Sequence, residues 1–201
     1  MSGNAPVQET RENIDRRVVR TRDILGDALV ALMLERPFEQ ITIKQVLARA
    51  GVGRTTFYEH FRNKDDLFKS DVEDFCQMMA GLLARTGAEP RRIAPVEELF
   101  SHLRDFRDFH NALVAAGKAD DVRELATHSF ARSIEERLQG AGVEMEQADL
   151  TATAQLLSGG LFSLLDWWIR EGMTAPPAEM DALFHRTAWN GLIATAPLEA
   201  G

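Results

Sequence analysis

Apolar residues recur at helical spacing along most of the chain. Leu25, Ala28, Leu29 and Leu32 fall on one face of a helix that starts near Asp15 and must end by Pro37. Further helical patterns cover residues 64–85, 96–116, 119–139, 147–171 and 178–195. Glycine or proline falls between these segments, and no convincing alternating pattern of strands appears. The pattern predicts an all-α protein.

Two shorter helices are expected between the first helix and the segment that begins at residue 64. Thr42 is a suitable N-cap for the first, over Thr42–Ala50, and the second runs over Arg54–Phe61. Gly51 separates them and can adopt the positive φ that the end of a helix often needs. Two short helices joined by a tight glycine turn have the layout of a helix-turn-helix, whose second helix enters the major groove of DNA.

The second of these helices has side chains suited to reading DNA. Phe57 and Phe61, at i and i+4, are expected to pack inward. This leaves five side chains to point outward: Arg54, Thr55, Thr56, Tyr58 and His60. Arginine pairs with guanine edges, and a threonine methyl contacts a thymine methyl. Lys64, at the start of the next helix, adds a charge beside free backbone N–H groups.

Several short motifs in this region resemble those of the tetracycline-repressor (TetR) family. They are Ile41-Thr42-Ile43, Ala50-Gly51-Val52, Thr56-Phe57-Tyr58, His60-Phe61 and Asn63-Lys64-Asp65-Asp66-Leu67. The resemblance covers about residues 15–70. It implies a bacterial homodimer that binds a palindromic double-stranded DNA operator, usually as a repressor, and responds to a small-molecule effector. The resemblance leaves both directions of regulation open, so the protein could repress or activate its target genes.

The resemblance also implies roles for individual residues. Thr42 would contact phosphate, and Arg54, Thr55 and Thr56 would face bases. Tyr58, His60 and Lys64 would hold the DNA backbone, with a position nearer a base as the alternative for His60. The chain departs from the family at Gly53, where many members have a serine. Glycine is a tolerable N-cap, but it supplies no hydroxyl for a phosphate.

The distribution of charge agrees with DNA binding at one end. Residues 1–64 carry 11 Lys/Arg against 8 Asp/Glu, whereas residues 65–201 carry 12 against 23. The whole chain of 201 residues has a net charge of −8. We therefore expect a disordered arm over 1–14, a three-helix DNA-binding domain over 15–64, and a helical regulatory and dimerisation domain over 65–201. A basic head on an acidic body suits a protein that presents one end to a polyanion.

The last two helical segments are the candidates for a dimer interface. Residues 147–171 are apolar on most sides, so this helix needs cover on more than one face. The helix over 178–195 has an apolar stripe with small residues that permit close approach. The predicted interface consists of Leu161, Leu165, Trp168, Leu183, Phe184, Thr187, Ala188 and Gly191. The alternative is that the helix over 147–171 is the central helix of a monomeric core.

An effector pocket is expected among the middle helices. Its predicted lining is Leu99, His102, Phe106, Phe109, Phe130 and Phe162. Several of these share one face of the helix expected over 96–116, and mostly apolar pockets with a few polar groups typically bind small molecules. The alternative is that His102 lies in the core or at the surface with its hydrogen bonds satisfied, and does not bind an effector.

Other kinds of function have little support in the sequence. His102 and His110 lie about 12 Å apart along a helix, too far to share a metal ion without distortion, so no metal and no cofactor is expected. No catalytic constellation appears, which argues against an enzyme. The single cysteine, Cys76, is expected in the core rather than in a redox role, and a cytoplasmic protein without a membrane segment is expected. A helical protein-interaction module that has lost DNA binding is the alternative function.

Overall fold

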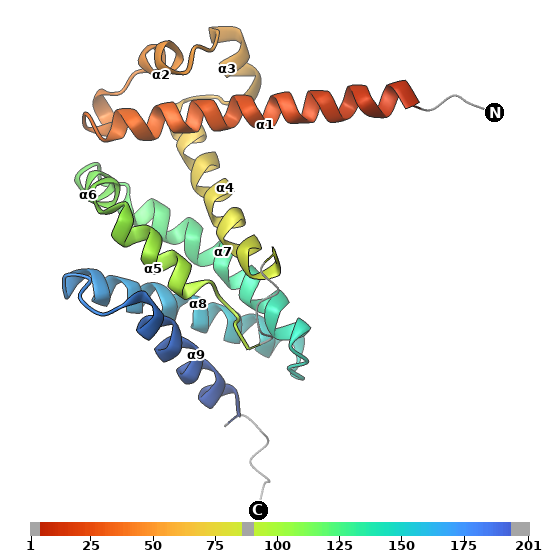
Figure 1. Cartoon of the computed structure of the whole chain (residues 1–201), viewed down its shortest axis with the longest axis vertical. Coiled ribbons are helices and arrows are strands. Elements are labelled where there is room, and N and C mark those ends of the chain that lie inside the picture. Colours follow the sequence, from red (N-terminus) through yellow and green to blue (C-terminus); the bar gives the residue numbers. More distant parts are fainter. Residues whose placement is uncertain (1–4, 86–90, 194–201) are drawn as a thin grey trace, which may run out of the picture. The chain divides into compact units, whose positions relative to one another are not determined.

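A computed structural model of the chain describes residues 5–85 and 91–193 (Figure 1). Every regular element among these residues is helical, and none is a strand, so the predicted all-α fold is confirmed. The described residues form two compact units. The first unit extends to Asp71 and also includes Asp108–Ala119. The second contains Val72–Arg107 and continues from Asp120.

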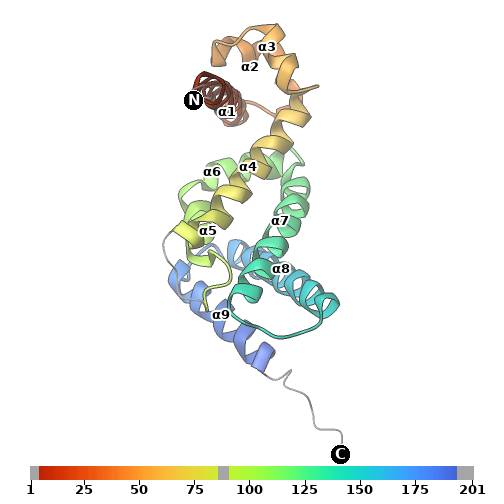
Figure 2. The same ribbon diagram turned by 90° about the vertical axis from the view of Figure 1, so that its right-hand side faces the viewer.

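The first unit is built around the helix-turn-helix. Its elements are α1 (Ala5–Met33), the short 3-10 helix η1 (Phe38–Gln40), α2 (Ile43–Ala50), α3 (Arg54–His60), the start of α4 (Lys64–Arg85) and most of α6 (Arg107–Ala115). Figure 2 views α1 nearly end-on, with α2 and α3 beside it. Helix α1 packs against α2. The buried core of this unit includes Leu25, Leu29, Phe38, Ile41, Val46, Phe57 and Leu67.

Helix α1 begins much earlier than the sequence pattern indicated. It runs from Ala5, so the segment expected to be a disordered arm up to residue 14 is helical from residue 5 onward. Apolar periodicity reports which part of a helix is buried, and a helix that extends past its packing partners has no need of that pattern. Pro6 lies in the first turn, where the missing N–H costs no hydrogen bond.

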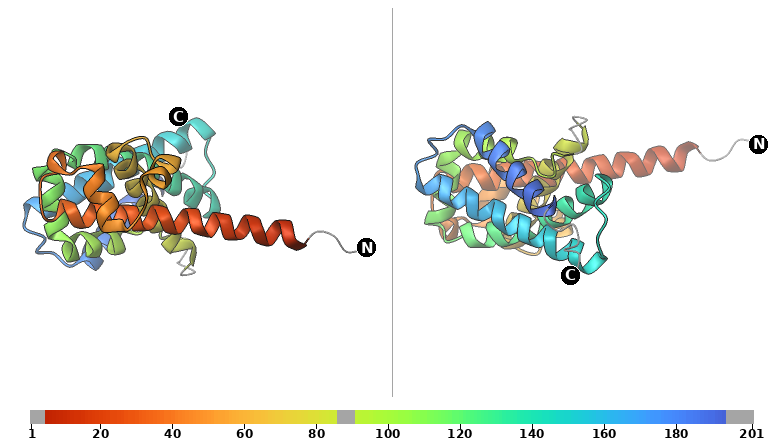
Figure 3. Two further views of the ribbon diagram at one scale, coloured as in Figure 1. Left: turned by 90° about the horizontal axis from the view of Figure 1, so that it is seen from above. Right: turned by 90° about the horizontal axis from the view of Figure 1, so that it is seen from below.

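The second unit contains the longer helices. Besides the rest of α4 it comprises α5 (Val96–Asp105), α7 (Ala119–Gly140), α8 (Gln147–Arg170) and α9 (Pro177–Ile193). Figure 3 shows α8 and α9 together on the face seen from below. Helix α5 packs against α9. The core here includes Leu83, Phe100, Phe130, Ile134, Leu161 and Trp168.

The single helix expected over 96–116 is two helices. Phe106 ends α5 with φ −110° and ψ 34°, and α6 begins at the next residue. The break contains neither glycine nor proline, so nothing local marks it. The Arg107 guanidinium donates to the carbonyl of Gly172, 3.1 Å away and 65 residues along the chain. The expectation of one continuous helix with a shared apolar face over 96–116 was therefore wrong.

Candidate nucleic-acid interface

Helix α2 is fixed at both ends by local interactions. The Thr42 side chain accepts from the Gln45 backbone N–H at 3.3 Å, while the Thr42 N–H donates to the Gln45 side chain at 2.8 Å. This reciprocal capping box confirms Thr42 as the N-cap. Gly51 ends the helix with φ 65°, and the Val52 N–H donates back to the Leu47 carbonyl at 3.2 Å. The turn is therefore closed by the backbone conformation that glycine adopts most readily.

Helix α3 divides its side chains between the core and solvent as the sequence indicated. Phe57 and Phe61 are buried with ring centroids 5.7 Å apart. Arg54, Thr55 and Tyr58 are exposed, and Tyr58 retains 48% of its accessible surface.

Within α3, the Arg54 guanidinium lies over the ring of Tyr58. The Arg54 guanidinium carbon lies 5.6 Å from the centre of the Tyr58 ring, one turn further along the helix. Thr56 and His60 are partly exposed beside them. The helix thus presents donors, a hydroxyl and threonine methyl groups on one surface, which are the groups that contact base edges and phosphates.

The start of α4 is tied down by charged and polar side chains. Asn63 caps it by accepting from the Asp66 N–H at 2.8 Å. Hydrogen bonds from the Arg62 side chain and backbone lower the pKa of the Asp66 carboxyl. The Lys64 ammonium donates to the Phe38 carbonyl at 2.6 Å and lies 4.3 Å from the Phe38 ring centre. The Lys64 side chain is only 17% exposed, and its contacts with Phe38 hold η1 in place. The sequence analysis did not predict this structural role for Lys64.

Other cations of the first unit are also engaged within the chain. Arg22 donates to the Ser70 hydroxyl, Arg49 pairs with Glu35, and Lys118 lies 3.0 Å from the Asp65 carboxylate. Among the described residues of the first unit, four exposed cations have neither an ion pair nor a side-chain hydrogen bond: Arg17, Arg20, Lys44 and Arg54.

Sequence reasoning predicted Arg54 as a DNA contact but missed Arg17, Arg20 and Lys44. Lys44 follows Thr42 closely at the start of α2. That position in the helix-turn-helix was the signal that could have identified Lys44.

The predicted pocket residues do not form one group. Leu99, Phe130 and Phe162 are buried in the second unit, where the rings of Phe130 and Phe162 meet edge-on. Phe106 is 54% exposed at the break between α5 and α6, so it does not line an enclosed pocket. Phe109 falls in the segment assigned to the first unit.

His102 lies in an aromatic stack. Its ring centre is 4.6 Å from that of Phe75 and 4.5 Å from that of Phe106. Burial lowers the pKa of His102, although Asp105 opposes that effect. The neutral imidazole is therefore favoured, and it packs much as another aromatic ring would.

Most of the predicted dimer residues are covered by the chain itself. Leu161, Leu165, Trp168, Phe184 and Ala188 are buried. They consequently belong to the core of this unit, and no side-chain surface remains for a second chain to cover. Leu183 is partly exposed, and Thr187 and Gly191 are exposed. A helix that is apolar all round gives no indication of which face the chain covers itself.

Helix α8 has an exposed stripe that the sequence analysis passed over. Leu156 is 75% exposed and Trp167 46% exposed. Gly160 and Ser163 lie between them at helical spacing and are also exposed. A Cβ placed on Gly159 or Gly160 would meet nothing within 4 Å.

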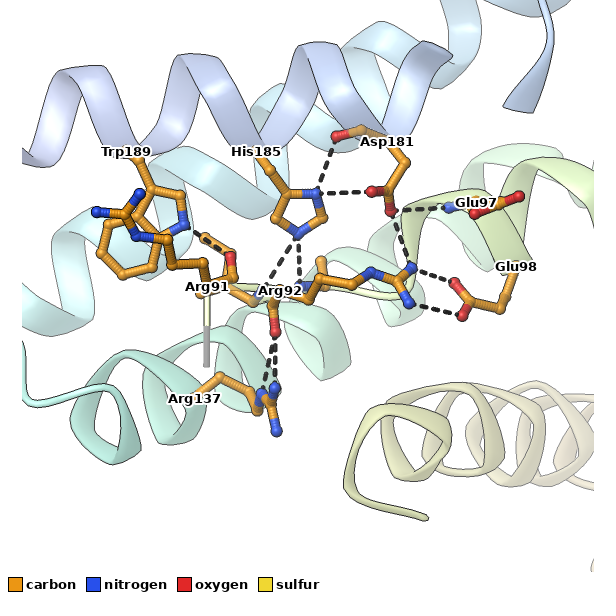
Figure 4. Close-up of polar contacts among 10 residues, drawn as sticks. Arg91, Arg92, Glu97, Glu98, Arg137, Asp181, His185 and Trp189 are labelled. Carbon is orange, nitrogen blue, oxygen red and sulfur yellow. Dashed lines mark hydrogen bonds and ion pairs between the residues drawn. The ribbon is translucent and has the colours of Figure 1, made fainter. Parts of the chain in front are cut away.

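A polar network in the second unit attaches the segment before α5 to α9 (Figure 4). Arg92 bonds both oxygens of Glu98, at 3.1 and 2.7 Å, and the Asp181 carboxylate at 2.9 Å. The His185 Nε2 accepts from the backbone N–H groups of Ile93 and Ala94, at 3.1 and 3.4 Å. The network holds the start of α5 against α9.

The described residues contain neither a metal-binding cluster nor a membrane-spanning helix. No group of three or more His, Cys, Asp or Glu side chains in the described part of the chain is arranged to hold a metal ion. None of the described helices is long and apolar enough to cross a membrane.

Comparisons with known proteins connect this geometry to a family. The family model described as "Bacterial regulatory proteins, tetR family" matches residues 25–70, which include the helix-turn-helix. An uncharacterised HTH-type transcriptional regulator of Bacillus subtilis (strain 168), YxbF, is 36% identical over 70 residues. That match covers 34% of this chain and 18% of the relative.

Solved structures share the fold over most of the chain. The dihydroxyacetone kinase operon activator DhaS has a TM-score of 0.60 and 14% identity, covering 88% of this chain and 96% of its own. SmeT, the repressor of the Stenotrophomonas maltophilia multidrug efflux pump SmeDEF, has a TM-score of 0.54 and 21% identity, covering 85% and 89%. Residues 25–70, which contain the helix-turn-helix, therefore form a DNA-binding domain of the tetR family of bacterial regulatory proteins.

Proposed function

We propose that the protein is a repressor that binds a palindromic operator as a homodimer and leaves it when a small molecule binds. The surface of α3 carries this proposal. Arg54, Thr55 and Tyr58 are exposed there, whereas Phe57 anchors the helix in the core. These side chains are the DNA contacts that we propose, together with the partly exposed Thr56 and His60 and with Thr42 at the start of α2. Lys64 supports this surface from within through its bond to Phe38.

The exposed stripe of α8 supports pairing with a second copy. Leu156 and Trp167 expose large apolar surfaces at its two ends, and Gly160 lies between them. Glycine lets the helix of a second chain approach closely, and burying the two large side chains removes apolar surface from water. If a two-fold axis passes through this stripe, each residue contacts either the same residue of the second chain or one close to it in that chain. We propose that this stripe, with the exposed residues Thr187 and Gly191 of α9, forms the dimer interface.

A two-fold dimer presents two copies of α3. Their recognition helices would then bind half-sites one helical turn apart, about 34–36 Å, or a multiple of that spacing. The operator is consequently expected to be a palindrome. Repression requires only that the dimer occupy the operator, whereas activation needs an additional productive contact. Among the proteins of similar fold, SmeT is described as a repressor and DhaS as an operon activator.

The proposed effector is a small, largely apolar molecule that binds within the second unit. Leu99, Phe130 and Phe162 are buried apolar side chains of that unit, between which an apolar molecule would have to insert, and the pKa of His102 is lowered by burial, which keeps its ring neutral. To change a 1:99 equilibrium into 99:1, the effector must favour the DNA-incompetent state by about 5.5 kcal/mol.

The dimer is tested by sedimentation and DNA binding together. We expect the wild-type chain to sediment as a dimer, and the Leu156→Glu, Trp167→Glu double variant to sediment as a monomer with weakened operator binding. Met78→Glu is the matched control because Met78 is an exposed apolar residue of α4 in the same unit. A monomeric wild type would contradict the homodimer. A double variant that stays dimeric would show that the interface lies elsewhere.

The direction of regulation is tested with a reporter gene behind the operator. Deleting the regulator should raise reporter expression, and restoring the wild-type chain should lower it again. A fall in expression after deletion would show that the protein is an activator.

A further inference from the structure

Two arginines on the outer face of α1 have no partner within the described chain. Arg17 and Arg20 are exposed, and neither guanidinium makes an ion pair or a hydrogen bond to a described residue. They stand three positions apart, so their side chains emerge from neighbouring points on one side of the helix. Arg22, only two residues further on, contrasts with them because it bonds Ser70 and lies 5.8 Å from the Phe61 ring centre.

Packing of α1 does not account for this pair. Among the residues of this helix whose side chains are described, which begin at Arg17, Leu25 is the first that is fully buried, and the buried face continues through Leu29 and Leu32. Arg17 precedes Leu25 by eight residues, which is about 12 Å along the axis of a helix. Figure 1 shows that the N-terminal part of α1 extends past α2 and α3. The two arginines therefore lie on a helix that the core holds firmly, but they contribute nothing to that core.

The charge along this helix also changes sign. Asp23 and Asp27 are exposed and follow the two arginines along α1. Positive charge is thus confined to the end of the helix that precedes its packed part. An arginine guanidinium is suited to phosphate because its planar donors bond two oxygens at once.

We propose that Arg17 and Arg20 bind backbone phosphates of the same DNA duplex that α3 reads, as a second and sequence-independent contact. This inference rests on the proposed function, because it requires the duplex to be held by the first unit. The Arg17–Arg20 pair and α3 belong to that same compact unit. Because the contact is to phosphate, it adds affinity for any sequence and leaves discrimination between sequences to α3.

The test is the salt dependence of DNA binding by the full-length chain. Fluorescence anisotropy would follow two duplexes: one selected by the wild-type protein from a random library, and one of random sequence. The variant is Arg17→Gln, Arg20→Gln, and the control is Asp27→Asn, which removes a charge of opposite sign from the same helix. Melting temperature and sedimentation confirm that each variant is folded and keeps its oligomeric state.

We expect the double variant to bind both duplexes more weakly, by the same factor. Each lost phosphate contact reduces the slope of log K against log salt by about 0.9, so the four arginines of a dimer account for about 3.6. Between 50 and 200 mM salt the wild type should then lose about 150-fold more affinity than the variant. Asp27→Asn should not reduce the slope.

Three results would overturn the inference. An unchanged slope would show that neither arginine contacts phosphate. A loss confined to the selected duplex would show base reading instead of backbone binding. A change in sedimentation of the double variant would show that the pair binds the acidic body of a second copy. Failure of the proposed function itself is recognised separately, because the wild type would then bind neither duplex.

Discussion

The helix ends of the helix-turn-helix and the polar network of the second unit are held in different ways. The bonds that cap the helix-turn-helix join residues close in sequence: Thr42 bonds Gln45, and Asn63 and Arg62 both bond Asp66. Longer-range bonds in the first unit, such as Arg22 to Ser70, lie outside these caps. In the second unit, partners are far apart. Arg92 bonds Asp181 across 89 residues, and the Trp189 indole N–H donates to the Arg91 carbonyl across 98 residues.

This difference shows which part of the molecule local rules can build. Each local bond in the helix-turn-helix sets one helix end and depends on a few neighbouring residues. The distant bonds of the second unit form only once α5, α7 and α9 have come together. A substitution in the second unit should therefore disturb several elements at once, whereas one in the helix-turn-helix should act on a single helix end.

The largest effect is expected at the centre of the second unit. Trp168 is fully buried, donates to the Ala175 carbonyl at 2.8 Å and packs 4.9 Å from the Phe100 ring centre. Trp168→Ala should lower the free energy of unfolding by about 3–5 kcal/mol, measured by urea denaturation. Met78→Ala, at an exposed apolar position, should change it by less than about 0.5 kcal/mol. Equal effects would contradict the assignment of Trp168 to the core.

The next largest effect is expected in the network between α5 and α9. Asp181→Asn removes the charge that Arg92 and His185 both contact, so it should cost about 2–3 kcal/mol of unfolding free energy. Asp105→Asn is the control, since the exposed ion pair of Asp105 with Arg104 should contribute less than about 1 kcal/mol. A cost for Asp181→Asn no larger than that of the control would show that the long-range network does not stabilise this unit.

The same carboxylate makes stability depend on pH. Burial raises the pKa of Asp181, but hydrogen bonds and charges from His185 and Arg92 outweigh burial and leave it lowered. The stabilisation is therefore complete above the unfolded-state pKa of about 3.9 and is lost as pH falls through the lower folded-state pKa. The difference in unfolding free energy between wild type and Asp181→Asn should shrink over that acidic range. A constant difference would contradict the assignment of the charge to Asp181.

The same contrast explains what the sequence could predict. The capping residue Thr42, the αL glycine Gly51 and the buried pair Phe57 and Phe61 are all specified by neighbours in sequence, and all were predicted correctly. The break at Phe106 was not, because it has no local signal and Arg107 bonds Gly172, which is distant in sequence.

The sequence pattern also could not predict which side chains of the second unit are buried. Helix α8 is apolar on most sides, so periodicity could not separate the buried Trp168 from the exposed Trp167. Periodicity also missed the first turns of α1, which extend past the packed part of the helix. Lys64 was predicted as a cation near DNA, but its bond to the Phe38 carbonyl depends on tertiary structure.

A smaller and strictly local effect is expected at the turn between α2 and α3. Gly51 has φ 65°, a conformation that costs a residue with a Cβ about 1–2 kcal/mol. Gly51→Ala should lower the free energy of unfolding by that amount, measured by thermal denaturation, although a Cβ there would touch nothing within 4 Å. A neutral substitution would show that the turn adjusts its backbone freely.

The smallest effect should have the opposite sign. Gly53 precedes α3 with φ −72° and ψ 154°, provides no side-chain cap, and has open space where a Cβ would lie. Gly53→Ser should stabilise the protein by about 0.5–1 kcal/mol, because it adds a cap and restricts the unfolded chain. Thr55→Ser serves as a control for adding a serine to an exposed part of the same helix. A destabilised Gly53→Ser variant would contradict the open geometry at this position.

The central claim, that α3 reads DNA, is tested most directly by comparing affinities for a selected duplex and a random one. Arg54→Ala, Tyr58→Ala should lower the affinity for the selected duplex by at least tenfold, because a base contact is worth about 1–3 kcal/mol. The affinity for random DNA should fall less. Glu59→Ala, at an exposed position of the same helix, should not weaken binding. If the double variant bound the selected duplex as tightly as the wild type, α3 would not be the recognition helix.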